Sequence, residues 1–267
     1  MFLKKKRRRN QSESIVKGSD FETLKKACVT KDAEAVRNLL ESGAPVNAKD
    51  TSGMSLLDIT LKYCDNIYIP QTVSISKMLL EAGCAKSEKT DSFVKTIGER
   101  FEFYRDNISK DIVDRLSSAL DELYVLFNVA PVPRRVVYDG TSPITVKTSI
   151  WQDQFEELWD KLVPGSGKAQ TVQGEMIRIV GRVTNEILDN GSINWGADHK
   201  LMLDTYSKFL DMNKGLEQSL VDEAGRISKS ISSKSDKTTL YRLAEITVKW
   251  VLANPNPLPL GKVDYYH

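Results

Sequence analysis

One short phrase is written twice in the first third of the chain, and it decides the fold. Leu39-Leu40-Glu41-Ser42-Gly43-Ala44 recurs, shifted by 40 positions, as Leu79-Leu80-Glu81-Ala82-Gly83-Cys84. Each copy has the apolar spacing of an amphipathic helix, followed by Gly, which easily adopts the left-handed conformation that ends helices. An internal repeat of this kind predicts that copies of one structural unit stack against each other.

The residues between the copies extend the pattern. A polar stretch from Asn47 to Gly53 is followed by Ser55-Leu56-Leu57-Asp58, which has the spacing of a helix-capping box. This order of amphipathic helix, glycine, polar finger and new helix resembles the ankyrin-repeat family. The repeat is divergent, because the family pattern Thr-Pro-Leu-His is replaced here by Ser55-Leu56-Leu57-Asp58.

The resemblance covers about residues 18–128. Helical spacing predicts helices over 21–29, from the N-cap Asp32 to Gly43, over 72–81 and over 93–105, and a further helix with Ile112 and Val113 that continues to about 127. Ile75-Ser76-Lys77 recurs as Ile108-Ser109-Lys110, an offset of 33, which is close to the usual ankyrin period of about 33 residues. We therefore expect a degenerate third unit that caps the array.

The first offset is longer than that period, which indicates an insertion near residues 64–70. Pro70 is expected to interrupt the helix there, so the insertion is predicted to be a loop that projects Ile67, Tyr68 and Ile69. Apolar residues on such a loop are either a contact site or a lid that packs on the body. The sequence leaves both alternatives open.

The second half of the chain is predicted to be a separate helical domain over residues 151–253. Helices are expected from Trp151 to a stop at Pro164-Gly165, and over 169–188, 197–212, 216–231 and 238–252. Residues 129–150, with Pro131 and Pro133, are expected to be a linker, and the proline-rich residues 254–267 a surface tail. The predicted fold class is thus all-α: a short, divergent ankyrin-like helical solenoid followed by a compact helical domain.

This second half is also similar to uncharacterised bacterial proteins. The likeness implies a bacterial origin and no activity. It rests on the following segments: Leu158-Trp159, Leu162-Val163-Pro164, Gly167-Lys168-Ala169, Thr171-Val172-Gln173-Gly174-Glu175, Asn190-Gly191 and Asn194-Trp195.

Charge is concentrated at the N-terminus. Residues 1–17 carry a net charge of +6, whereas the other residues carry −4. The segment is predicted to be a basic disordered tail. Its basic side chains would contact an anionic membrane or nucleic acid, or would form a solvated leader without a specific role. These side chains are Lys4, Lys5, Lys6, Arg7, Arg8 and Arg9.

Cysteine usage favours a reducing compartment. Cys28, Cys64 and Cys84 are odd in number and far apart, and the chain has two histidines and no C-x-x-C pair. We expect buried thiols, no disulfide framework, no metal, no cofactor and a cytoplasmic location. The N-terminus lacks the apolar region of a secretory signal, and no apolar run is long enough to predict a transmembrane helix.

One polar stripe could carry chemistry. Glu175, Arg178, Arg182 and Glu186 fall on one face of the predicted helix 169–188. They would form an enzyme site or an anion-ligand pocket, although pairing of charges along a helix more often produces such a stripe. The segment from Gly165 to Thr171 lacks the first glycine and the hydroxyl of a phosphate-binding loop, so we interpret it as an interhelical turn.

The leading functional interpretation is a non-enzymatic protein-binding module. The ankyrin resemblance implies binding to another protein. In bacteria it implies an adaptor, or an immunity protein that occupies the surface of a toxin. The acidic body favours a basic partner. The resemblance places the contacts at Lys49, Asp50, Thr51, Met54, Asp58, Lys62 and Tyr63, and the inserted loop adds Ile67, Tyr68 and Ile69.

Overall fold

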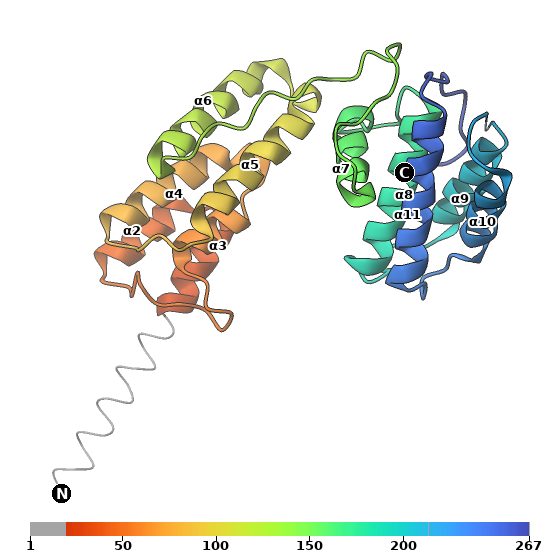
Figure 1. Ribbon diagram of the computed structural model, residues 1–267. Coiled ribbons are helices and arrows are strands. Elements are labelled where there is room, and N and C mark those ends of the chain that lie inside the picture. Colours follow the sequence, from red (N-terminus) through yellow and green to blue (C-terminus); the bar gives the residue numbers. More distant parts are fainter. Residues whose placement is uncertain (1–19, 213, 267) are drawn as a thin grey trace, which may run out of the picture. The chain divides into compact units, whose positions relative to one another are not determined.

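The structure, a computed structural model, describes residues 20–212 and 214–266. In these ranges the regular secondary structure is helical, which confirms the predicted all-α fold class (Figure 1). Pairing of extended residues is limited, in the same ranges, to isolated bridges between Lys49 and Ser55 and between Thr171 and Pro259. The predicted basic tail, residues 1–17 with Lys4 to Arg9, lies outside the described residues.

Contacts divide the chain into two compact units, with the boundary between Arg134 and Arg135. This boundary falls inside the segment 129–150. The segment has no helix, but it is not a free tether. Val129 and Val132 pack on the core of unit 1. Tyr138 and Ile144 are buried in unit 2.

Unit 1 is built from helices that pack in two rows. In one row α2 packs on α4, and α4 packs on α6. In the other row α3 packs on α5. The rows contact each other through α3 with α4 and through α5 with α6 (Figure 1). A helix over residues 20–30 precedes α2. The labelled elements are α2 (Ala33–Glu41), α3 (Leu56–Lys62), η1 (Asn66–Tyr68), α4 (Ile69–Glu81), α5 (Thr90–Tyr104), η2 (Arg105–Asn107) and α6 (Lys110–Phe127).

The repeated phrase ends α2 and α4 in the same way. Gly43 and Gly83 have φ of 84° and 87°. In both copies the N–H after the glycine donates to a carbonyl five residues back, Ala44 to Leu39 and Cys84 to Leu79. This is the Schellman arrangement, which satisfies carbonyls at the end of a helix. The same six-residue pattern thus produces the same helix end twice. At the other end of α2, Asp32 accepts from the Ala35 N–H, as the N-cap prediction required.

The insertion differs from the prediction. Residues 66–68 form η1, and α4 begins at Ile69, with Pro70 in its first turn. Proline is well tolerated there because the first N–H groups of a helix have no intrahelical acceptor and its fixed φ suits the helix. Pro70 therefore starts a helix instead of interrupting one. Ile67 and Tyr68 are exposed, but Ile69 is fully buried, so the expectation that Ile69 projects from a loop is wrong.

Unit 2 is arranged around α8, which packs against α7, α9 and α11, while α10 packs on α9 and α11 (Figure 1). Most residues of α8 are buried, including charged ones. This central position places its polar side chains in the interior. The elements are α7 (Trp151–Leu162), α8 (Val172–Leu188), α9 (Ala197–Leu210), α10 (Gln218–Ser230) and α11 (Lys237–Ala253).

The residues after α11, predicted to be a surface tail, are mostly exposed or half-buried, but they are anchored to unit 2. Gln173, fully buried in α8, donates its side-chain amide to the carbonyls of Asn254 and Asn256 and accepts from the Leu258 N–H. Proline removes N–H groups but leaves every carbonyl free to accept. The segment is held by hydrogen bonds to the start of α8, and Tyr265 is buried near its end.

Candidate functional site

The polar finger of unit 1 is a tight turn organised by Asp50. Its carboxylate accepts from the N–H groups of Ser52 and Met54 and from the Ser52 hydroxyl. These bonds hold the pKa of Asp50 below its ordinary value, and the bond from the Ser52 hydroxyl contributes most. Lys49 and Thr51 are exposed beside it, and Met54 is half-buried. The turn therefore presents a fixed set of polar side chains.

Asp58 is not part of that surface, and its assignment as a contact residue is wrong. It is almost fully buried. It forms the predicted capping box with Ser55, and its other oxygen accepts from the hydroxyls of Ser87, at 2.8 Å, and Thr90, at 3.0 Å. The carboxylate thereby joins the start of α3 to the start of α5. Its role is structural.

The connection from α3 to α4 carries the most exposed apolar group of the predicted site. Tyr63, Ile67 and Tyr68 are 51%, 56% and 39% exposed. The ammonium of Lys62 lies 5.6 Å from the centroid of the Tyr63 ring. Cys64 and Ile69, on the same stretch, are fully buried. The three exposed side chains are thus anchored on both sides by core residues.

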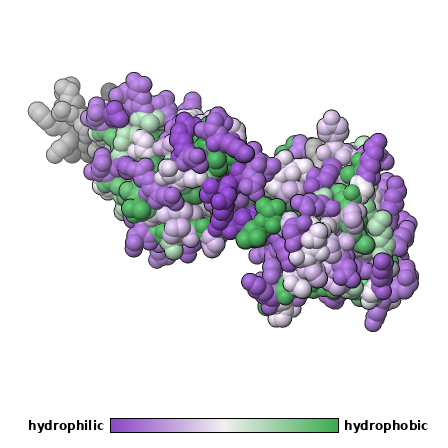
Figure 2. Space-filling view, turned by 90° about the horizontal axis from the view of Figure 1, so that it is seen from above, coloured by the Kyte–Doolittle hydropathy of each residue, from purple (hydrophilic) through white to green (hydrophobic). Residues whose placement is uncertain are grey.

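Asp50 of the finger and Tyr63 at the end of α3 both act on Lys25, which lies on the helix over residues 20–30. The pKa of Lys25 is raised first by its hydrogen bond to Glu22 and further by the nearby Asp50 and Tyr63. Lys25 was not singled out by sequence, because its position on the preceding helix gave no functional signal. Figure 2 shows apolar side chains among hydrophilic ones on the face of unit 1 that it presents. We name the following residues the contact surface: Lys49, Asp50, Thr51, Met54, Lys62, Tyr63, Ile67 and Tyr68.

The polar stripe of α8 does not form one pocket. Glu175 and Arg178 are fully buried and pair with each other, with Arg178 Nη2 2.6 Å from Glu175 Oε1. Glu175 also accepts from the Ala169 N–H at 2.9 Å and from the Tyr265 hydroxyl. Burial opposes the charge of Glu175, but the bonds from Arg178 and Tyr265 hold its pKa below its ordinary value. No face of this pair is open to solvent.

Glu186 lies apart from this pair, whereas Arg182 acts on a residue next to it. Glu186 is buried at the opposite end of α8, where it accepts from the Asn190 amide and from the N–H and amide of Asn194. It orders the loop after α8. Arg182 is half-buried and contributes, after burial and Arg178, to lowering the pKa of Lys168. The predicted pocket of four residues is therefore wrong as a single site.

Tyr265 completes this cluster, and sequence reasoning missed it. Its ring lies under two cations, with Lys168 Nζ 4.1 Å and Arg178 Cζ 5.8 Å from the ring centroid. Burial first, and then the hydrogen bond to Glu175, raise the pKa of the Tyr265 hydroxyl. Tyr265 therefore remains a proton donor to Glu175. A contact over 90 positions leaves no signal in a single sequence.

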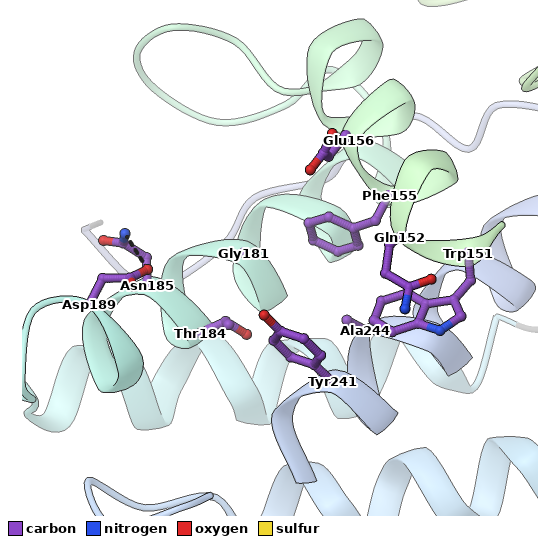
Figure 3. A pocket seen from close by; sticks show the side chains of 10 residues that line it. All are labelled: Trp151, Gln152, Phe155, Glu156, Gly181, Thr184, Asn185, Asp189, Tyr241 and Ala244. Atoms are coloured by element: carbon purple, nitrogen blue, oxygen red, sulfur yellow. Dashed lines mark hydrogen bonds between the residues drawn. The ribbon is translucent and has the colours of Figure 1, made fainter. Parts of the chain in front are cut away.

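Unit 2 also has an open hollow of about 240 Å³ where α7, α8 and α11 meet. Figure 3 shows Trp151 and Phe155 of α7 and Tyr241 of α11 around a space above Gly181 and Thr184 of α8. We name it the aromatic hollow. The sequence predicted the helix that carries Trp151 and Phe155, but it did not single out Tyr241. Its lining residues are Trp151, Gln152, Phe155, Glu156, Gly181, Thr184, Asn185, Asp189, Tyr241 and Ala244.

The cysteines lie in the core of unit 1. Cys28, Cys64 and Cys84 are free and buried, and burial raises the pKa of the Cys28 thiol to about 11. Among the described residues, no cluster of histidine, cysteine and carboxylate side chains has the arrangement of a metal site. The helices within residues 20–212 and 214–266 include none with the length and apolar character of a membrane span.

Comparison of the chain with protein-family models, with curated proteins and with solved structures finds no match.

Proposed function

We propose that the chain is a non-enzymatic protein-binding module and that the contact surface of unit 1 binds the partner. The observation that carries the proposal is the group Tyr63, Ile67 and Tyr68, which is exposed although its neighbours Cys64 and Ile69 are fully buried. Large apolar side chains that face water are unfavourable. Burying them against a partner surface is favourable, so their exposure marks a binding site.

The anchoring of this group favours affinity. Binding is weakened when side chains and loops must become ordered at the interface. Here Cys64 and Ile69 fix the connection in the core, and η1 packs on α4 and α5. Tyrosine is also enriched among the residues that dominate binding energy. Tyr63 and Tyr68 are therefore the residues that we expect to contribute most.

The ankyrin-like interpretation of unit 1 belongs to this proposal. It is supported by the identical helix ends at Gly43 and Gly83, by the finger around Asp50, and by the capping box of Ser55 and Asp58. The mode of action would be occupation of a partner's surface, as in an adaptor or a toxin-neutralising immunity protein. The acidic balance outside residues 1–17 favours a basic partner, and we place the protein in the reducing cytoplasm.

The test is affinity capture from the native host, followed by a binding titration with the purified partner. The Tyr63→Ala/Tyr68→Ala double variant is expected to weaken binding at least about 30-fold, which is the loss of a single hot-spot residue that contributes about 2 kcal/mol. Its thermal unfolding should stay close to that of the wild type, because both rings are substantially exposed. Tyr266→Ala, at a fully exposed tyrosine of unit 2, is the matched control. Unchanged affinity in the double variant would refute the proposed surface.

A further inference from the structure

The aromatic hollow of unit 2 is held open by fixed packing. The rings of Phe155 and Trp159 are stacked with centroids 6.5 Å apart, and Trp159 lies on Gly181, where a Cβ atom would be 2.2 Å from the indole. Trp151 contacts Tyr241 edge to face at 5.8 Å. These contacts hold the aromatic side chains that line the hollow. The space between them is therefore part of the native packing.

The charge that lines the hollow is acidic. Of the residues in the described part of the chain that line it, the charged ones are Glu156, on α7, and Asp189, just after α8. Both are exposed at the rim. Three aromatic side chains, Trp151, Phe155 and Tyr241, also line it, and the faces of aromatic rings attract cations. The aromatic rings and the two acidic side chains therefore both favour a positively charged ligand.

Thr184 supplies a polar group inside. Its hydroxyl oxygen is buried and has no hydrogen-bond partner among the described residues. Figure 3 shows its side chain extending toward Tyr241. A buried hydroxyl without a partner is unfavourable, because it has lost its bond to water without replacing it. A ligand with a hydroxyl or amine group would satisfy it.

Lys237 shows how the chain itself uses one of these rings. Its ammonium lies 4.8 Å from the centroid of Tyr241. The Tyr241 ring thus already accepts a cation. The same positive charge repels a second cation nearby, so a bound cation would be placed toward Trp151, Phe155 and Glu156.

We propose that the aromatic hollow binds a small organic cation that carries a hydroxyl or amine group. Its volume of about 240 Å³ is below the roughly 300–1,000 Å³ of clefts for drug-sized ligands, which limits the occupant to a few heavy atoms. The aromatic rings surround the apolar part of the ligand, Glu156 and Asp189 attract its charge, and Thr184 bonds its polar group. This site is independent of the contact surface of unit 1.

The test uses three probes of similar size on the full-length chain. They are choline, its neutral isostere in which carbon replaces the ammonium nitrogen, and pivalate as an anion. Binding is followed by NMR shifts of the Gly181, Thr184 and Ala244 amides. Choline should bind with a dissociation constant on the order of 1 mM, about three- to tenfold more tightly than the neutral isostere. Pivalate should cause no saturable shift.

Three variants test which side chains cause the preference for a cation. Glu156→Gln should weaken choline binding about two- to fivefold and leave the neutral isostere unchanged. Asp153→Asn, at an exposed acid of α7 outside the hollow, is its matched control. Lys237→Gln removes the competing ammonium and should tighten choline binding by a similar factor. Thr184→Leu fills the space and should abolish binding of both probes, with circular dichroism confirming the fold.

Equal affinity for choline and the neutral isostere would overturn the proposal, because the acidic rim would then have no effect. Weaker choline binding in Lys237→Gln would overturn it as well. So would the absence of saturable shifts at the three amides with every probe.

Discussion

The Tyr265 hydroxyl donates a hydrogen bond to Glu175, so the last turns of the described chain are joined to the first turn of the central helix α8. Both residues are buried. The bond ends on a carboxylate that already pairs with Arg178. The segment after α11 is consequently anchored to the core of unit 2 through its buried residues Asn254 and Tyr265.

Tyr265→Phe is expected to destabilise unit 2 by about 1.5–3 kcal/mol, because a hydrogen bond to a charged, buried group is lost. The ring and its contacts with Lys168 and Arg178 remain. Urea unfolding measures the effect. Tyr266→Phe, at a side chain that is 99% exposed, should change stability by less than about 0.5 kcal/mol. Equal effects of the two variants would show that the Tyr265 bond has no energetic role.

Glu175→Gln should cost about 3–5 kcal/mol, since it leaves the buried charge of Arg178 without its counter-ion. The double variant with Arg178→Met should recover part of the loss, because neither charge is then buried. A double-mutant cycle measured in urea gives the coupling between the two residues. The exposed pair of Lys77 and Glu122 is the comparison, and Glu122→Gln should cost at most about 1 kcal/mol. Additive effects at Glu175 and Arg178 would contradict the structural assignment.

Asp58→Ala should destabilise unit 1 by about 3 kcal/mol or more, because the hydroxyls of Ser55, Ser87 and Thr90 lose a charged acceptor. Asp114→Ala, at an exposed acid in the second turn of α6, should have little effect on stability. Thermal unfolding distinguishes them. Under conditions where Asp58→Ala remains folded, its affinity for the partner should be unchanged. Lost binding with full stability would return Asp58 to the contact surface.

Gly181→Ala and Gly225→Ala should change stability in opposite directions, although both glycines lie within helices. A Cβ atom at Gly181 would be 2.2 Å from the Trp159 ring, so the substitution should cost about 1–3 kcal/mol. At Gly225 the nearest atom, of Leu210, is 3.8 Å away, which is ordinary contact. There the helix propensity of alanine should add about 0.5–1 kcal/mol. Urea unfolding of both variants is the measurement, and a neutral Gly181→Ala would contradict the packing of Trp159.

Asp139 should give unit 2 an acid-dependent stability. Its carboxylate accepts from the Ser142 hydroxyl and from the N–H groups of Ser142 and Thr141, which lowers its pKa to about 2. The unfolded value is about 3.9. The contribution is therefore complete above about pH 4 and is lost as the pH falls toward 2. The difference in unfolding free energy between wild type and Asp139→Asn should shrink over that range. Asp153→Asn provides the control for a general loss of charge, and a difference independent of pH would refute the prediction.

Local chemistry accounts for what could be predicted from the sequence. The ends of α2 and α4 follow from Gly43 and Gly83, and the start of α3 follows from Ser55 and Asp58. Helical spacing predicted α7 as a helix that begins at Trp151 and is ended by Pro164-Gly165, and it placed α8 to α11 within a few residues. These features depend on residues a few positions apart, which is the range over which a single sequence is informative.

The predictions that were wrong depend on how a helix is oriented in the fold and on contacts between residues far apart in the sequence. The spacing of Glu175 and Arg178 placed them on one face of a helix, but it could not reveal that α8 is surrounded by neighbours and that this face is buried. Pro70 fits both the interruption and the first turn of a helix, and only the packing of Ile69 distinguishes the two. The bond between Tyr265 and Glu175 depends on tertiary structure alone.

The buried thiols of unit 1 provide a natural probe for the unfolding of that unit within the intact chain. All three cysteines precede residue 134, whereas the four tryptophans, Trp151, Trp159, Trp195 and Trp250, all belong to unit 2. A thiol reagent reacts with the thiolate, so burial and the raised pKa of Cys28 delay labelling until unit 1 opens. Indole fluorescence follows unit 2 in the same sample. The order in which the two halves unfold can be read without cutting the chain or attaching a dye.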